Sequence, residues 1–283
     1  MWLAWNTAAI IAAALAVVSV SLRLFGRRAL VVIADVAKEV AVILGLYAVW
    51  QKAGDVAVTK ITGAVAHGRW IWHVERLAHL PSEVSVQRLV LPHRALVEGL
   101  NIFYAVVHVP ALIIFLIWLY FRHRPEYPHW RNVGAVLTGM SLLIQAIPVA
   151  PPRLLPQYGF VDTAVKYGQS VYGPHGISIA PQLAAMPSVH VAWSLFIALA
   201  VLRTSTSRWR GLIVLHPVAT TFAVVATANH WWLDGIVAAA LLPLALLICW
   251  AASLVFAQYR VSAVIASTRG ESGDLLPAPV ADG

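Results

Sequence analysis

The sequence predicts an all-α fold: a polytopic transmembrane helical bundle of six to seven spans, with interfacial helices on the extracytoplasmic side. Of the 283 residues, 60% are hydrophobic and 11% are charged, whereas about a quarter of a soluble domain is charged. Mean hydropathy is +0.77, and apolar runs near the roughly 20 residues that cross a bilayer recur along the chain. The 12 tryptophans fit interfacial aromatic belts. Together these observations exclude a soluble globular protein.

Seven apolar runs can be drawn, and each is interpreted as a helix because a spanning segment must satisfy its own backbone polar groups. The number of spans is six or seven depending on whether the second run crosses the membrane, because the charged residues Asp35, Lys38 and Glu39 lie near its start. The fifth run is short. The runs cover residues 2–22, 30–50, 100–121, 133–149, 187–202, 212–228 and 232–256.

The basic residues predict the orientation of the bundle. A net charge of +8 would suggest a nucleic-acid partner in a soluble protein, but here arginine is concentrated in short loops between the apolar runs. With the N-terminus outside, the arginine-dense loops fall inside, as the positive-inside rule expects. They lie at residues 23–28, 122–131, 203–210 and 260–269. We therefore expect a multi-pass plasma-membrane protein and no nucleic-acid partner.

Composition divides the chain into three parts. Residues 1–98 hold the N-terminal spans and an outer segment that mixes charges with Trp70 and Trp72. That outer segment is either a set of interfacial helices, with one beginning near Pro81, or an ordinary folded loop. Residues 99–257 form the transmembrane bundle, and residues 258–283, rich in Ala, Ser, Gly and Pro, predict a disordered cytoplasmic tail.

His230 and Asp234 lie four residues apart at the start of the last apolar run, so they share one helix face. Asp234 can accept a hydrogen bond from one ring nitrogen of His230 and leave the other nitrogen free to attack. This is the arrangement of a nucleophile and its orienting group. The alternative is a satisfied His–Asp pair that only joins two helices.

A second polar stretch begins the fifth run. Pro187 suits a first helical turn and Ser188 suits a cap. The amides that open a helix have no intrahelical partners and carry partial positive charge, which favours a bound phosphate. His190 then lies in the first turn, where it could protonate a leaving alkoxide. The alternative is a capping or hydrogen-bonded histidine. Our interpretation places both histidines together at the extracytoplasmic edge of the bundle, across a gap the size of an anion.

The stretch Pro187-Ser188-Val189-His190, followed by His230-x-x-x-Asp234, resembles the type-2 phosphatidic acid phosphatase superfamily over about residues 101–246. The usual second motif there is Pro-Ser-Gly-His, and the third ends in His-x-x-x-Asp. The resemblance implies that His230 is the nucleophile that forms a phosphohistidine, with Asp234 orienting it. It also implies that His190 is the general acid and that Ser188 helps hold phosphate.

Three positions depart from the family pattern. Val189 replaces the motif glycine, Val224 replaces the arginine six residues before the nucleophile, and Ile117 replaces the lysine of the first motif ahead of Arg124-Pro125. These departures, together with Pro151-Pro152-Arg153, resemble the inositolphosphotransferase-like branch, which includes fungal inositol phosphorylceramide synthases.

A phosphate still needs positive partners. Arg153, outside and near the end of a span, is the first candidate because a guanidinium grips phosphate bidentately. Lys166 is the second, and a solvated loop charge is the alternative for either. Asn101, Tyr104 and His108 form a polar stripe at helical spacing that either lines the substrate site or bonds between helices. A similar stripe, mostly structural, is Thr138, Ser141 and Gln145.

These residues predict a metal-independent enzyme without a cofactor that moves phosphate or a phosphorylated head group to or from a lipid. Its partners would be a lipid phosphate or phospholipid and an alcohol acceptor such as an inositol or lipid hydroxyl. Hydrolysis to inorganic phosphate is the first alternative. A zinc site built from His190, His230 and Asp234 is the second. A non-catalytic membrane scaffold or carrier is the third.

Overall fold

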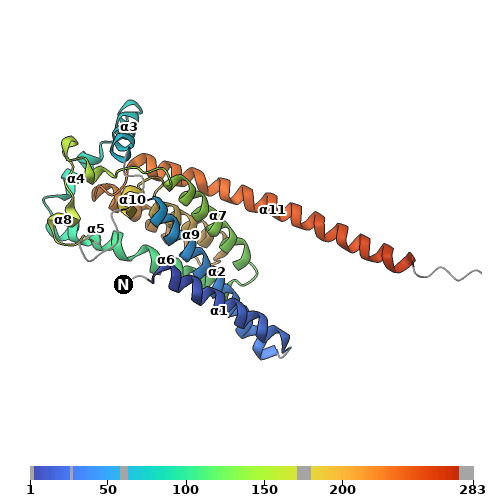
Figure 1. Ribbon diagram of the computed structural model, residues 1–283. Coiled ribbons are helices and arrows are strands. Elements are labelled where there is room, and N and C mark those ends of the chain that lie inside the picture. The colour runs from blue at the N-terminus through green and yellow to red at the C-terminus, as the bar shows by residue number, and fades with distance from the viewer. Residues whose placement is uncertain (1–2, 26–27, 58–62, 171–179, 274–283) are drawn as a thin grey trace, which may run out of the picture.

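The computed structural model describes residues 3–25, 28–57, 63–170 and 180–273. Within these ranges the regular elements are helices, apart from one isolated bridge between Val149 and Ala184. The all-α prediction is therefore confirmed for the described part of the chain. Figure 1 shows a bundle with a group of short helices at one end and a long helix that projects from the other.

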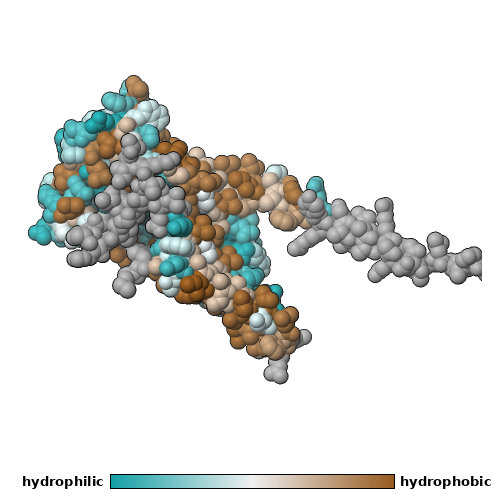
Figure 2. Space-filling view, in the orientation of Figure 1, coloured by the Kyte–Doolittle hydropathy of each residue, from teal (hydrophilic) through white to brown (hydrophobic). Residues whose placement is uncertain are grey.

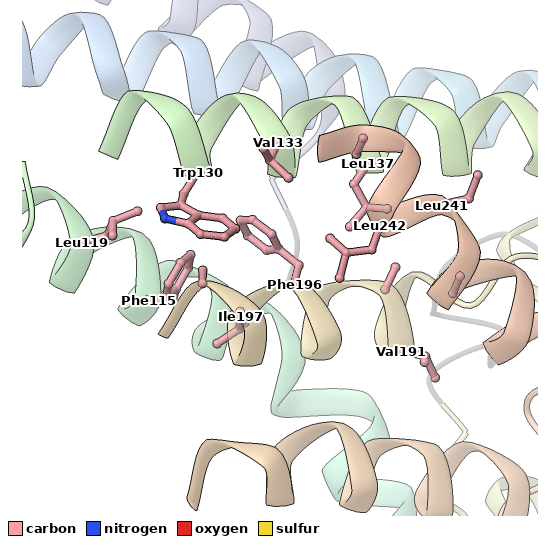
Figure 3. Packing of buried hydrophobic residues seen from close by; sticks show 14 of the residues in the cluster. Phe115, Leu119, Trp130, Val133, Leu137, Val191, Phe196, Ile197, Leu241 and Leu242 are labelled. Atoms are coloured by element: carbon pink, nitrogen blue, oxygen red, sulfur yellow. The ribbon is translucent and has the colours of Figure 1, made fainter. Parts of the chain in front are cut away.

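The centre of the bundle is a cluster of apolar side chains from five helices: α6 (His108–Arg122), α7 (Tyr127–Gln145), α9 (Val189–Thr204), α11 (Trp232–Gly273) and the end of α10 (Leu215–Ala226). Phe196 is fully buried in this cluster, 5.4 Å from the ring of Phe115 (Figure 3). α10 packs against α9 and against α5 (Arg94–Val106). The two polar stretches of the sequence lie where α9 and α11 begin.

α1 (Trp5–Leu24) and α2 (Arg28–Ala57) pack against each other, and α2 also contacts α7 (Figure 1). The acidic residues near the start of α2 are ion-paired. Asp35 lies 3.0 Å from Arg124, and Glu39 binds Arg131. The charges inside this apolar run are therefore neutralised by arginines near the start of α7, which lowers the cost of placing them next to lipid.

The segment between α2 and α5 contains two helices, α3 (Ala64–Leu77) and α4 (Glu83–Val90). They gather at one end of the bundle with α8 (Thr163–Lys166) and the short turns η1 (Pro152–Leu154), η2 (Pro156–Tyr158) and η3 (Ala180–Leu183) (Figure 1). We call this group the cap. Much of the hydrophilic surface in this view lies over the cap, whereas the coloured stretch of α11 that leaves the bundle and the α1–α2 tip are mostly hydrophobic (Figure 2).

By length and composition, two helical stretches could cross a membrane, Trp5–Leu24 and Trp232–Gln258, and α5 with α6 adds a third if the bent pair is one span. The third apolar run was expected to be continuous, but its helix bends by 50° at Val107. Pro110 explains the break, because it cannot donate to the carbonyl of Val106 and its ring clashes there. α9 and the stretch Arg210–Ala226 are shorter apolar helices. The count of six to seven spans remains a prediction.

α11 extends further than the last apolar run. We expected an unstructured tail from residue 258, but the helix continues to Gly273, and residues 274–283 lie outside the described ranges. No proline or glycine interrupts the chain between Pro243 and Gly270, so the backbone has no local reason to leave the helix there.

Candidate active site

Ser188 and His190 lie at the beginning of α9. Ser188 is the N-cap residue, fully buried, and its hydroxyl accepts a hydrogen bond from the amide of Val191 at 3.3 Å. Its own amide donates to the carbonyl of Asp234 at 3.2 Å, which ties the start of α9 to the first turn of α11. The Ser188 hydroxyl binds only one of the first-turn amides of α9, so the others are available to an anion.

His230 and Asp234 were expected to share one helix face, but α11 begins at Trp232 and His230 lies before it, in the buried connection from α10. The two side chains still meet, and the surroundings of His230 decide its tautomer. Nδ1 is 2.8 Å from the carbonyl oxygen of Ala185 and 3.1 Å from Oδ2 of Asp234. A carbonyl oxygen only accepts, so the hydrogen belongs on Nδ1 and the lone pair on Nε2. Nε2 is buried and has no hydrogen-bond partner among the described residues. Asp234 is fully buried, and its Oδ2 also accepts from the amide of Trp231 at 2.9 Å.

The structure brings the two histidines of the sequence analysis close together. The ring centroids of His190 and His230 are 5.6 Å apart, although the residues start different helices. Tyr104 of α5 lies beside both, with its ring 4.4 Å from His190 and 6.2 Å from His230. The two imidazoles and the Tyr104 ring therefore form one cluster where α9 and α11 begin.

Two further histidines continue this row. His108 lies edge-on to His190 at 4.6 Å, and His216 of α10 lies 6.2 Å from His108. Nε2 of His108, Nε2 of His216 and Nδ1 of His190 are buried and lack hydrogen-bond partners in the described part of the chain. Such atoms call for water or a bound polar group. His216 was not singled out from the sequence, because a lone histidine in an apolar run gives no local signal.

Within the described ranges, no group of three or more His, Cys, Asp or Glu side chains could hold a metal ion.

Arg153 is buried in η1 close to the connection that carries His230. Its amide donates to the carbonyl of Ala228 at 2.9 Å, two residues before His230. Its Nε lies 3.3 Å from Oδ2 of Asp162. Lys166, in contrast, is exposed on α8 with its ammonium 5.5 Å from the Tyr167 ring, and no described contact joins it to the histidines.

The polar stripes separate into two kinds of contact. Tyr104 and His108 meet the histidines, but the side chain of Asn101 bonds to Thr163 and Gln169, both at 2.9 Å, and so joins α5 to α8 and the chain that follows it. The stripe on α7 makes structural bonds: Thr138 accepts from Trp193, and Gln145 donates to the carbonyl of Pro187. Ser141 bonds within its own helix.

Two of the positions that depart from the family motifs, Val224 and the segment at Arg124, lie where they cannot bind a phosphate at His230. Val224 is buried in the apolar cluster, and its carbonyl accepts from the amides of Asn229 and His230. Arg124 pairs with Asp35, in the part of the bundle remote from the cap. Neither position therefore supplies positive charge next to His230.

Sequence reasoning missed two carboxylates of the cap. Glu75 and Glu83 are fully buried, and they accept hydrogen bonds from the amides of Leu233 and Trp232, at 2.7 and 3.4 Å. Burial first, and then the neighbouring Glu83, raises the pKa of Glu75 to about 9. One signal was available: Glu75 follows Ile71 by four residues and so shares the buried face of its helix.

Comparison with known proteins gives one family. A family model described as the PAP2 superfamily matches residues 69–248, a range that contains every residue of the candidate site. No curated protein and no solved structure matches the chain.

Proposed function

Because this chain belongs to the PAP2 superfamily, we propose that it transfers a phosphoryl or phosphorylated head group from a lipid through a phosphohistidine at His230. The transfer would resemble that of the inositolphosphotransferase-like branch, with an alcohol as acceptor. The superfamily match by itself indicates an enzyme of the phosphatase or phosphotransferase class that acts on phosphate esters.

One observation carries the proposal. The Nδ1–H of His230 is held by Ala185 and Asp234, so the lone pair of Nε2 is left in a buried position without a hydrogen-bond partner among the described residues. A nucleophile needs such a free lone pair, and the fixed ring removes the cost of orienting it. The partner acid is close, because the ring of His190 lies 5.6 Å away.

In the first step, Nε2 of His230 attacks phosphorus and the bond from phosphorus to the leaving lipid oxygen breaks. His190 gives its proton to that oxygen, so an alcohol leaves rather than an alkoxide. Asp234 stabilises the positive charge that develops on the His230 ring. The phosphoryl oxygens are held by the first-turn amides of α9 beside Ser188 and by Arg153.

In the second step, the hydroxyl of the acceptor attacks phosphorus while His190, now neutral, takes its proton. The N–P bond breaks, and His230 recovers its lone pair. When a phosphoryl group is transferred, an alcohol acceptor gives a phosphomonoester and water gives inorganic phosphate. When a phosphorylated head group is transferred, an alcohol gives a phosphodiester and water gives the phosphomonoester of the head group. The two outcomes differ only in the acceptor, so hydrolysis is the direct competitor of transfer.

The test is a panel of vesicles that contain labelled lipid phosphates or phospholipids, with and without free inositol, incubated with the purified protein. We expect a labelled phosphate ester of the added alcohol, which is a phosphomonoester from a lipid phosphate and a phosphodiester from a phospholipid. Release of inorganic phosphate or of the head-group phosphate alone would make the protein a hydrolase. Denaturing the protein in alkali at short times should retain label on wild type, because phosphohistidine survives alkali.

His230→Ala should abolish both product and retained label. His129→Ala is the matched control, because His129 is exposed on α7 and the row of buried histidines does not include it. Equal activity of wild type and His230→Ala, or no activity across the panel, would refute the proposal and favour a scaffold or carrier.

A further inference from the structure

Three consecutive amides at the beginning of α11 are each bound by a carboxylate. The amide of Trp231 donates to Asp234, that of Trp232 to Glu83, and that of Leu233 to Glu75. These amides have no partners inside the helix, and negative charge is favourable at this end of it. Asp234 belongs to α11 itself. The other two carboxylates reach it from the cap, across 149 and 158 residues of sequence.

The two cap carboxylates lie side by side in a buried place. Glu75 and Glu83 are both 0% exposed. Oε1 of Glu75 accepts from Leu233 at 2.7 Å, whereas Oε2 is buried without a hydrogen-bond partner among the described residues. Glu83 accepts from Arg76 at 3.3 Å through its second oxygen. A single proton between the two carboxyl groups would satisfy the remaining oxygen of Glu75 and remove the repulsion of two adjacent charges.

We propose that Glu75 and Glu83 are positioning residues that share one proton and thereby hold the first turn of α11, with the His230–Asp234 pair, against the cap. The inference rests on the function proposed for His230, because the first turn of α11 carries Asp234, the carboxylate that orients the His230 ring. The connection that holds His230 is fastened from a second side as well, since the indole of Trp231 donates to the carbonyl of Ala150 at 3.0 Å.

The charges around Glu75 favour this arrangement. Glu83 of α4 and Asp234 of α11 are the carboxylates that face it, and Arg76 of its own helix is bound to Glu83 and lies over the Trp72 ring at 4.7 Å. Among the described residues, Glu83 has an ion pair with Arg76, whereas no ion pair joins Glu75 to a basic side chain. A second full charge on the Glu75–Glu83 pair would lack a partner, which is costly in a buried site.

The sign of the pH dependence follows from the raised pKa. The pKa of Glu75 moves from the ordinary value of 4.5 to about 9, first through burial and then through Glu83. The folded protein therefore prefers the protonated carboxyl. Its contribution to stability is complete below about pH 4.5, declines as the pH rises, and is lost above about pH 9. Above that pH the two charged carboxylates repel and the first turn of α11 loosens.

Four proteins test the proposal: wild type, Glu75→Ala, Glu75→Gln and Glu98→Gln. Glu75→Ala removes the acceptor for Leu233, so we expect kcat to fall on the order of tenfold to a hundredfold with little change in KM. Glu75→Gln keeps an acceptor and a neutral donor toward Glu83, so it should restore most of that loss and lack the wild-type decline above about pH 9. Glu98→Gln makes the same chemical change at a surface ion pair with Arg94 and should behave as wild type.

Two readouts do not depend on catalysis and separate this inference from the proposed function. Wild type near pH 7 should show an infrared band of a protonated carboxylic acid that titrates near pH 9 and is missing in Glu75→Gln. Amide hydrogen exchange of the peptide over residues 231–234 should be faster in Glu75→Ala than in Glu98→Gln at one fixed pH.

An enzyme inactive on every lipid would overturn the proposed function, while the band and the exchange rates would still test the carboxyl pair. The positioning role is overturned if no such band exists, if exchange at residues 231–234 is equal in Glu75→Ala and Glu98→Gln, or if Glu75→Ala keeps the wild-type kcat and pH profile.

Discussion

Replacing Asp234 with Asn measures how much of the catalytic arrangement depends on a buried charge. Oδ2 of Asp234 accepts two hydrogen bonds, from Nδ1 of His230 at 3.1 Å and from the amide of Trp231 at 2.9 Å. An asparagine in the same rotamer keeps a carbonyl oxygen at that position, so both bonds survive with a neutral acceptor. Ala185 continues to hold the Nδ1 hydrogen at 2.8 Å, so the reactive tautomer of His230 is retained.

The expected loss follows from these contacts. Exchanging a charged acceptor for a neutral one costs about 1–1.5 kcal/mol for a hydrogen bond. The positive charge that develops on the attacking ring adds a similar amount, so the barrier rises by roughly 2–3 kcal/mol and kcat falls about 30- to 160-fold. This is much less than the roughly 10⁴-fold loss seen where an aspartate alone sets the tautomer of a catalytic histidine.

The assay is single-turnover formation of the phosphohistidine with labelled lipid phosphate, for wild type, Asp234→Asn and Glu126→Gln. Glu126 is exposed at the start of α7, on a helix whose first residues belong to the region remote from the cap, and serves as the matched carboxylate-to-amide control. A loss near 10⁴-fold would contradict the role given to the Ala185 carbonyl. Unchanged rates would show that Asp234 does not orient the nucleophile.

Two further predictions concern the packing of the cap and its side of the membrane. Gly68→Ala would place a methyl carbon 2.8 Å from the carbonyl oxygen of Ala150, so α3 must shift and the thermal midpoint in detergent should fall by an amount equivalent to about 1–3 kcal/mol. In the control Gly99→Ala the new methyl carbon meets nothing within 4 Å, so this change should stabilise α5 by up to about 1 kcal/mol. An equal fall of the midpoint in both variants would contradict the close contact with Ala150 as the cause. In a background that lacks the native cysteine, Leu77→Cys, which is 80% exposed on α3, should react with an impermeant maleimide on intact cells, whereas Arg208→Cys should react only after permeabilisation. The reverse labelling pattern would place the active site on the cytoplasmic face.

Much of the helical pattern could be read from local sequence. Each apolar run is largely helical, although the third is divided into α5 and α6, because a helix is the local solution for a chain that must satisfy its backbone groups among apolar side chains. The bend at Val107 could also have been predicted, since Pro110 removes one bond of the helix and blocks its geometry. The length of α11 was underestimated, because a composition rich in Ala and Ser was taken as disordered although it lacks helix-breaking residues up to Gly270.

What the sequence by itself determined are contacts between residues close along the chain: the pairing of His230 with Asp234 at the start of α11, and the serine that caps α9 next to His190. Only the tertiary structure decided which carbonyl holds the His230 ring, that His190 lies 5.6 Å from it, and that Glu75 and Glu83 bind the start of α11. The physical reason is range. Residues three or four apart are already close along the chain, whereas groups 45 to 158 residues apart meet only after packing of the bundle and cap has fixed their positions.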